Sequence, residues 1–169
     1  MSYKNKTYVA FASEDIHLYR LMEAWRENEH IDFDFFDAHD LFISRDTSKP
    51  ETIKKNLTER IKNAKQVVIL GSASAKTKGG DGNSFLAHEV EAIINLDLPV
   101  VVANVNGDRN INRAFIPTPF LDENYYTISV SFQPKIIKFA LDNYAASFKD
   151  SEKEGPHFYK ADVYKNLEL

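Results

Sequence analysis

The chain has 169 residues, of which 43% are hydrophobic, and a formal net charge of −4. This length accommodates one compact domain with a sizeable core. The sequence contains no cysteine, which excludes a disulfide framework and thiolate chemistry. Acidic and basic residues are interspersed, so the basic patch of a nucleic-acid-binding protein is missing and we expect no nucleic-acid partner.

Features of membrane, secreted and metal-binding proteins are also missing from the sequence. No apolar run approaches the roughly 18 to 20 residues that span a bilayer, and the N-terminal stretch MSYKNKTYVAF lacks the layout of a signal peptide. The histidines show no metal-ligand spacing; they are His17, His30, His39, His88 and His157. We therefore expect a cytoplasmic protein with neither a membrane partner nor a metal.

The first part of the chain predicts two strands around a helix. Residues 6–12 (KTYVAFA) form a β-prone run, and residues 31–37 (IDFDFFD) alternate apolar and acidic side chains, as a strand with one wetter face does. Between them we expect a helix over residues 15–28. Its predicted apolar stripe consists of Leu18, Leu21, Met22 and Trp25. Residues 38–47 follow neither period and predict a polar loop.

A second helix, strand and loop are predicted next. Residues 48–51 (SKPE) form a capping-box pattern with proline in the first turn, so a helix is expected to begin there. The apolar stripe of that helix consists of Ile53, Leu57 and Ile61. Residues 66–70 (QVVIL) predict a buried strand. Residues 72–83 are rich in Gly, Ser and Lys and predict a mobile loop.

The stretch over residues 84–104 (SFLAHEVEAIINLDLPVVVAN) predicts an amphipathic helix, a tight turn and then a strand buried on both faces. An irregular connection over residues 105–124 follows it. We expect the last strand over residues 125–129 and a final helix from Pro134, where apolar residues recur with the 3.6 period.

This alternation of strands and helices predicts an α/β fold. Right-handed crossovers turn the pattern into a doubly wound parallel five-stranded sheet, and the flavodoxin-like strand order 2-1-3-4-5 is the simplest solution. We expect one domain over residues 1–148. Residues 149–169 are charged and turn-rich, so they predict a C-terminal tail. The side chains expected to dock this tail are Phe158, Tyr159 and Tyr164.

Ligands of such sheets bind in the crevice beyond the carboxyl ends of the strands. The predicted strand ends bring six candidate substrate-binding residues to one rim, namely Phe11, Ala12, Ser13, Asp37, His39 and Ser72. The helix that begins at the same rim carries Phe85 and Glu89 on one face, because the two residues are four positions apart. The sequence therefore predicts a site with one aromatic wall and one carboxylate.

Most of these candidates also have an ordinary structural explanation. A glutamate on an amphipathic helix such as Glu89 is usually a solvent-facing charge, and an aromatic residue within a strand such as Phe11 is usually core. Ser13 is as well placed to cap a helix as to bind a phosphate. Asp37 and His39 suit a strand-end turn as well as a ligand contact.

Four stretches of the sequence resemble the TIR-like family of the Thoeris-type prokaryotic antiphage defence systems. They are VAFASED, FFDAHD, ETIKKNLTERIKNAKQVVILGS and FLAHEVEAIINLDLPVVVANVNG. The resemblance covers roughly residues 6–107. In that family a tryptophan commonly stands four residues before the functional glutamate; the corresponding residue here is Phe85, which keeps an aromatic wall without the indole donor.

The resemblance implies cleavage of the nicotinamide–ribose bond of NAD, with the ADP-ribose part becoming a cyclic or conjugated signal for a downstream effector. By position, Glu89 matches the family's catalytic glutamate. NAD is then a substrate, no cofactor is expected, and a homo-oligomer is left open. Elementary chemistry agrees, because a fixed carboxylate stabilises the positive charge that develops on ribose only as the bond breaks.

Two other functions stay open. A nucleoside 2-deoxyribosyltransferase-like enzyme has a similar glutamate on a similar helix, and its substrate preference separates it from an NAD-consuming enzyme. A non-catalytic TIR-type scaffold or adaptor acts through self-association instead of chemistry. A receiver domain is disfavoured, because the first strand ends in FASED without an adjacent acidic pair at its end.

Overall fold

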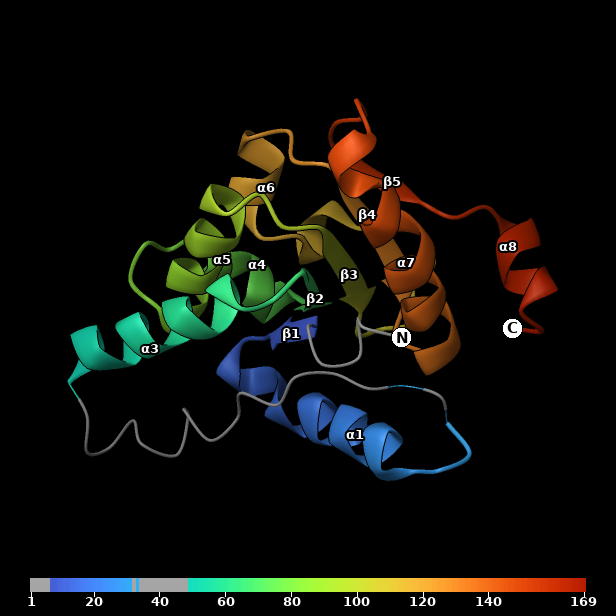
Figure 1. Ribbon diagram of the computed structural model, residues 1–169, viewed down its shortest axis with the longest axis horizontal. Coiled ribbons are helices and arrows are strands. Elements are labelled where there is room, and N and C mark those ends of the chain that lie inside the picture. Colours follow the sequence, from blue (N-terminus) through green and yellow to red (C-terminus); the bar gives the residue numbers. More distant parts are fainter. Residues whose placement is uncertain (1–6, 32, 34–48) are drawn as a thin grey trace.

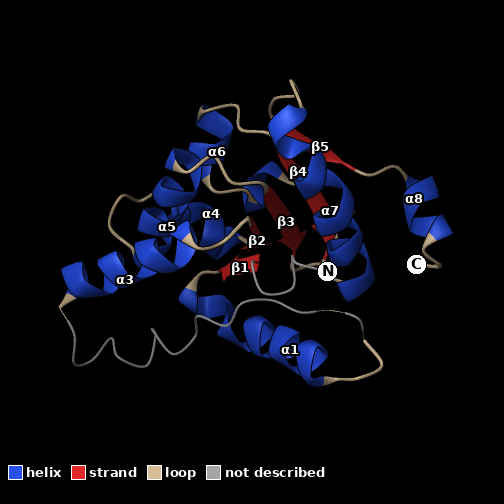
Figure 2. Ribbon diagram, in the orientation of Figure 1, coloured by secondary structure: helices blue, strands red, loops and turns tan. Residues whose placement is uncertain are grey.

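The computed structural model describes residues 7–31, 33 and 49–169. Within these residues, five parallel strands form one sheet in the order β1-β2-β3-β4-β5 (Figures 1 and 2). The strands are β1 (Thr7–Ala10), β2 (Gln66–Gly71), β3 (Val100–Asn104), β4 (Thr127–Ser131) and β5 (Pro156–Phe158). The predicted α/β fold with an all-parallel, five-stranded sheet is confirmed.

Helices cover both faces of this sheet (Figure 1). One face is covered by α1 (Ile16–Glu27), α7 (Pro134–Ser147) and α8 (Ala161–Asn166). The other is covered by α3 (Pro50–Lys62), α4 (Ala73–Gly79), α5 (Phe85–Asn95) and α6 (Thr118–Asp122). Short 3-10 helices span Ser13–Asp15, Arg113–Phe115 and Phe148–Asp150. The sheet is therefore doubly wound, as predicted.

The central strands form the core because successive side chains of a strand point to opposite faces. In β2, Val68 and Leu70 belong to the cluster under α1 and α7, whereas Val67 and Ile69 belong to the cluster under α3 and α5. Every residue of β2 and β3 is buried. This explains why both strands read in the sequence as unbroken apolar runs.

The predicted first helix is present, but its buried stripe differs from the expected one. Met22 is fully buried and Tyr19 is 1% exposed, whereas Leu21 is 44% exposed. Tyr19 and Met22 are three positions apart and face the sheet together, and Leu21 lies about 100° around the helix from Met22. The inclusion of Leu21 in the stripe was wrong. The predicted stripe of α3 is confirmed in full, since all three of its residues are buried.

The segment predicted as a mobile loop over residues 72–83 contains α4. The helix begins because the Ser72 hydroxyl accepts the backbone N–H of Ala75, at 3.0 Å, as an N-cap. It ends at Gly79, where an added Cβ would lie 2.7 Å from Cβ of Pro117. The glycine is thus required by close packing, and the prediction of a loop was wrong.

Two predicted segments lie largely outside the described residues: the strand over residues 31–37 and the loop over residues 38–47. Ile31 and Phe33 are described, and neither is in a strand. The place of that strand beside β1 therefore stays a prediction. The other four predicted strands lie side by side in the sheet in the expected order, as β1, β2, β3 and β4.

The C-terminal segment predicted as a tail contributes β5 and α8 to the fold. Strand β5 pairs in parallel with β4, and the buried Tyr164 hydroxyl accepts the backbone N–H of Ser131 at 3.1 Å. Helix α7 connects β4 to β5 on the face opposite to α4, α5 and α6, so this crossover has the opposite hand to the two before it. Crossovers of one hand are strongly preferred, which is why no rule applied to the sequence predicts this strand.

The integration of this segment predicts a large difference between two aromatic residues. Tyr164→Ala should lower the free energy of unfolding by roughly 3 to 5 kcal/mol, because it removes a buried ring and its hydrogen bond. Phe158→Ala, at a side chain that is 45% exposed, should cost under about 1 kcal/mol. Urea denaturation measures both. Equal small losses would show that the segment adds no stability.

Candidate functional site

The beginning of α5 is fixed by the residue before it. The Ser84 hydroxyl accepts the backbone N–H of Ala87 at 3.1 Å and donates to the backbone carbonyl of Lys78, at the end of α4, at 2.7 Å. Below this first turn, Leu86, Val90 and Ile93 pack against the sheet. The helix therefore starts at a defined point beside the carboxyl end of β1.

A cavity of about 320 Å³ lies at this point, between the end of β1 and the beginnings of α3 and α5. Its lining residues are Phe11, Ala12, Ser13, Pro50, Lys54, Lys78, Asn83, Ser84, Phe85 and Leu86. The structure thus brings together four of the residues predicted from the sequence: Phe11, Ala12, Ser13 and Phe85. Phe11 is held in place by stacking on Tyr19, with ring centroids 4.6 Å apart.

Glu89 lies one helical turn beyond Phe85 and is 1% exposed. The hydroxyl of Tyr8, on β1, donates to Oε2 of this carboxylate at 2.5 Å. Side chains of a helix lean toward its N-terminus, so that of Glu89 leans toward the turn that lines the cavity. Glu89 itself is not among the residues that line the cavity, although Phe85 and Leu86 of the preceding turn are.

The electrostatics of this pair keep Tyr8 in its neutral form. Burial raises the pKa of the Tyr8 phenol well above its ordinary value of 10, and the charge and hydrogen bond of Glu89 raise it further. Tyr19 adds a smaller upward effect, and the positive charge of Arg60 lowers the pKa slightly. Tyr8 therefore keeps its proton and serves as a hydrogen-bond donor to Glu89.

Two lysines approach the cavity from different helices. Lys54 lines it from α3, and Lys78 lines it from α4. The Lys78 ammonium donates to Glu14 Oε1 at 2.6 Å and to the Ser13 hydroxyl at 3.2 Å. The hydrogen bond from Lys78 to Glu14 lowers the pKa of the exposed Glu14 carboxyl. The hydrogen bond that the Ser13 hydroxyl donates to the same carboxyl lowers it further. Ser13, predicted from the sequence as a phosphate-binding candidate, thus lies next to an ammonium group.

The remaining predicted site residues are placed differently. Ser72 is buried and does not line the cavity; its hydroxyl donates to Asp15 Oδ2 at 2.5 Å and also caps α4. Its contacts are those of a structural residue. Asp37 and His39 lie outside the described residues.

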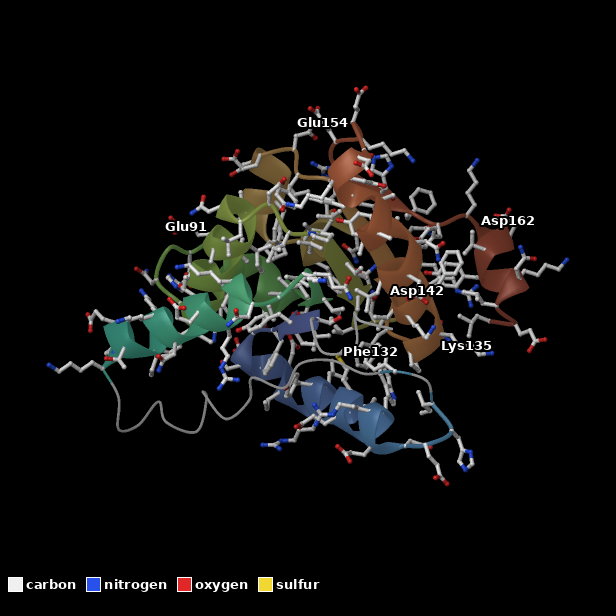
Figure 3. All side chains as sticks on the ribbon, viewed as in Figure 1. Glu91, Phe132, Lys135, Asp142, Glu154 and Asp162 are labelled. Atoms are coloured by element: carbon white, nitrogen blue, oxygen red, sulfur yellow. The ribbon has the colours of Figure 1, made fainter. Side chains whose placement is uncertain are left out.

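The two polar neighbours of Glu89 face elsewhere. The His88 ring nitrogen Nε2 lies 2.7 Å from the Thr58 hydroxyl and 3.0 Å from the Lys54 carbonyl oxygen, so it connects α5 to α3. Glu91 is exposed on the outer side of α5 (Figure 3). Neither side chain joins Glu89, in agreement with the expectation from helical spacing.

Sequence reasoning missed Tyr8, Lys54 and Lys78. Tyr8 was read as one residue of an apolar strand, yet the period of two puts it on the same face as Ala10 and Ala12. Two small side chains beside a tyrosine leave room for its hydroxyl to reach a helix packed on that face. The lysines gave no signal, because charged residues on amphipathic helices are common.

One protein-family model matches a region of the chain that contains this whole site. The model of the Thoeris protein ThsB, TIR-like domain, matches residues 8–110, which is more than half of the chain. The chain belongs to this TIR-like family. The matched region of the TIR-like domain includes Tyr8, Glu89 and every residue that lines the cavity. A comparison with curated proteins returned no match.

Membership of the TIR-like family associates the chain with Thoeris antiphage defence. Strands β4 and β5 lie beyond the matched region. No helix in the described part of this TIR-like chain is long and apolar enough to cross a membrane. The described residues also contain no cluster of three or more acidic, histidine or cysteine side chains able to hold a metal ion.

The raised pKa of Tyr8 predicts a loss of stability at alkaline pH. Well below pH 10 the phenol is neutral in both the folded and the unfolded chain. Above pH 10 the unfolded chain loses this proton and the folded chain keeps it, so the free energy of unfolding falls with a slope of up to about 1.4 kcal/mol per pH unit from this residue.

Tyr8→Phe should therefore flatten the decline of stability between pH 10 and 11, as measured by urea denaturation at several pH values. The comparison uses slopes, because the variant also loses a constant free energy of about 1 to 3 kcal/mol with its hydrogen bond. Parallel slopes for the variant and the wild type would contradict the assignment.

Proposed function

We propose that this TIR-like chain cleaves the N-glycosidic bond between nicotinamide and ribose in NAD, and that the ADP-ribose part becomes a cyclic or conjugated signal for a partner effector in antiphage defence. Glu89 is the proposed catalytic residue. Its burial beside the cavity, together with membership of the family, carries the proposal.

The burial of Glu89 favours a chemical role over a purely structural one. Removing a carboxylate from water costs several kcal/mol unless charge partners and hydrogen bonds compensate for it. An apolar side chain at this position would complete the surrounding cluster of Leu86, Val90 and Ile93 at lower cost. A buried carboxylate next to a cavity is accordingly a functional-site candidate.

The proposed reaction uses this charge directly. The bond between ribose C1′ and the nicotinamide nitrogen breaks, its electron pair leaves with neutral nicotinamide, and positive charge develops on the ribose. At about 4 Å and an effective dielectric of 20, two opposite unit charges attract by roughly 4 kcal/mol, worth about three decades of rate if it is realised only in the transition state. A nucleophile then attacks C1′ to complete the transfer.

The cavity lining supports a substrate with both aromatic and anionic parts. The half-buried Phe85 offers an apolar face for a planar base, and Lys54, together with Lys78, whose ammonium already contacts Glu14, brings positive charge for a diphosphate. A nucleoside offers no phosphate to these lysines. The lining therefore favours NAD over the substrate of a nucleoside 2-deoxyribosyltransferase-like enzyme.

A scaffold that acts by self-association is the second candidate function. It requires neither a lined cavity nor a buried carboxylate, so it leaves the position of Glu89 unexplained. The two functions make opposite predictions for one substitution.

Glu89→Gln should abolish nicotinamide release from NAD, with a loss of at least about a hundredfold, because the amide cannot offset the charge that develops on ribose. Glu91→Gln is the matched control, since it removes the same charge from the exposed side of the same helix. Chromatography measures nicotinamide in lysates of phage-infected cells that express each variant, so that any activating trigger is present. Mass analysis of the same samples identifies the ADP-ribose product.

Equal nicotinamide release by wild type and Glu89→Gln would remove Glu89 from the mechanism. Release of a free base from nucleosides, without consumption of NAD, would favour the nucleoside enzyme instead. The absence of turnover by all variants in these lysates would favour the scaffold.

A further inference from the structure

Glu89 is held from a strand distant in sequence. The donor, Tyr8, lies 81 residues earlier, and its hydroxyl lies 2.5 Å from Glu89 Oε2. This O···O separation is at the short end of the range for hydrogen bonds to a charged acceptor. The contact is therefore strong, and it joins β1 directly to α5.

The tyrosine itself has little freedom to move. Tyr8 is fully buried, and its backbone pairs with Val67 in the sheet. Its ring belongs to the same packed cluster as Ile61, Val90 and Ile93, which come from α3 and α5. A donor fixed on a rigid strand fixes the acceptor in turn, and catalytic groups need this kind of support.

We infer that Tyr8 is a positioning residue for Glu89: its hydroxyl holds Oε2 and thereby fixes the direction of the proposed catalytic carboxylate. The inference rests on the proposed function. In this role Tyr8 acts through Glu89, to which its hydroxyl donates, and not on the substrate itself.

The groups around the pair support this role. Arg60 on α3 contributes a positive charge and Tyr19 on α1 a neutral phenol, and Glu89 itself is the negative charge that faces Tyr8. Because burial and Glu89 together raise the pKa of Tyr8 well above 10, its proton is available for donation throughout the physiological range. A hydrogen bond to an ionised carboxylate favours the ionised form.

The kinetic test compares Tyr8→Phe with Tyr144→Phe. Both variants lose a buried tyrosine hydroxyl that makes hydrogen bonds, but Tyr144 lies in the cluster on the opposite face of the sheet, where it contacts Val100 N–H and the Tyr126 carbonyl oxygen. In phage-infected lysates and with purified protein, Tyr8→Phe should lower kcat for NAD cleavage by about 10- to 100-fold, with KM changed by less than about threefold. Tyr144→Phe should keep the wild-type kcat.

The pH dependence of kcat provides a readout that a loss of stability would not move. Without its tyrosine donor the carboxylate is protonated more readily, so the acidic limb of the profile should move to higher pH in Tyr8→Phe and stay in place in Tyr144→Phe. Equal kcat and equal pH profiles for the two variants would overturn the inference and leave the proposed function standing.

A spectroscopic readout needs no turnover. A proton shared over 2.5 Å between a phenol and a carboxylate should give a strongly downfield proton NMR resonance in the wild type, and both Tyr8→Phe and Glu89→Gln should lose it. A resonance that survives in Glu89→Gln, or none in the wild type, would overturn the inference. Wild-type kinetics in Glu89→Gln with the resonance lost would instead overturn the proposed function.

Discussion

The site depends on one contact, the hydrogen bond from Tyr8 on β1 to Glu89 on α5. It combines two demands that ordinarily conflict, since the core excludes water and a carboxylate needs it. The phenol replaces part of the lost hydration, and the ring completes the apolar cluster around it. The first turn of α5, whose residues line the cavity, is consequently tied to the centre of the fold.

The fold could be predicted where a short pattern determines the structure. The apolar run of β3, the helical period of α5 and the stripe of α3 lead directly to their observed elements, because burial on both faces and burial on one face give different periods. Helix α4 was missed because its N-cap serine and its glycines also suit a loop. Strand β5 was missed because its position depends on a crossover of the rarer hand.

The candidate site was predictable to a similar extent. Strand ends and helix starts meet at one edge of a parallel sheet, which is sufficient to bring Phe11 and Phe85 to the same cavity. The partner of Glu89 was not predictable, because a hydrogen bond across 81 residues depends on the register between a strand and a helix that no local pattern encodes. For Ser72 the local pattern was misleading. Its position at a strand end suggested a ligand contact, but its hydroxyl donates to Asp15 and caps α4.

The central claim is that the carboxylate of Glu89 meets the ribose of NAD. The most direct measurement is a crystal structure of the Glu89→Gln variant with NAD bound. The account predicts ribose C1′ within about 4 Å of the residue 89 side chain, with the nicotinamide ring against Phe85 and the diphosphate near Lys54. NAD bound elsewhere, or with its ribose out of reach of residue 89, would contradict it.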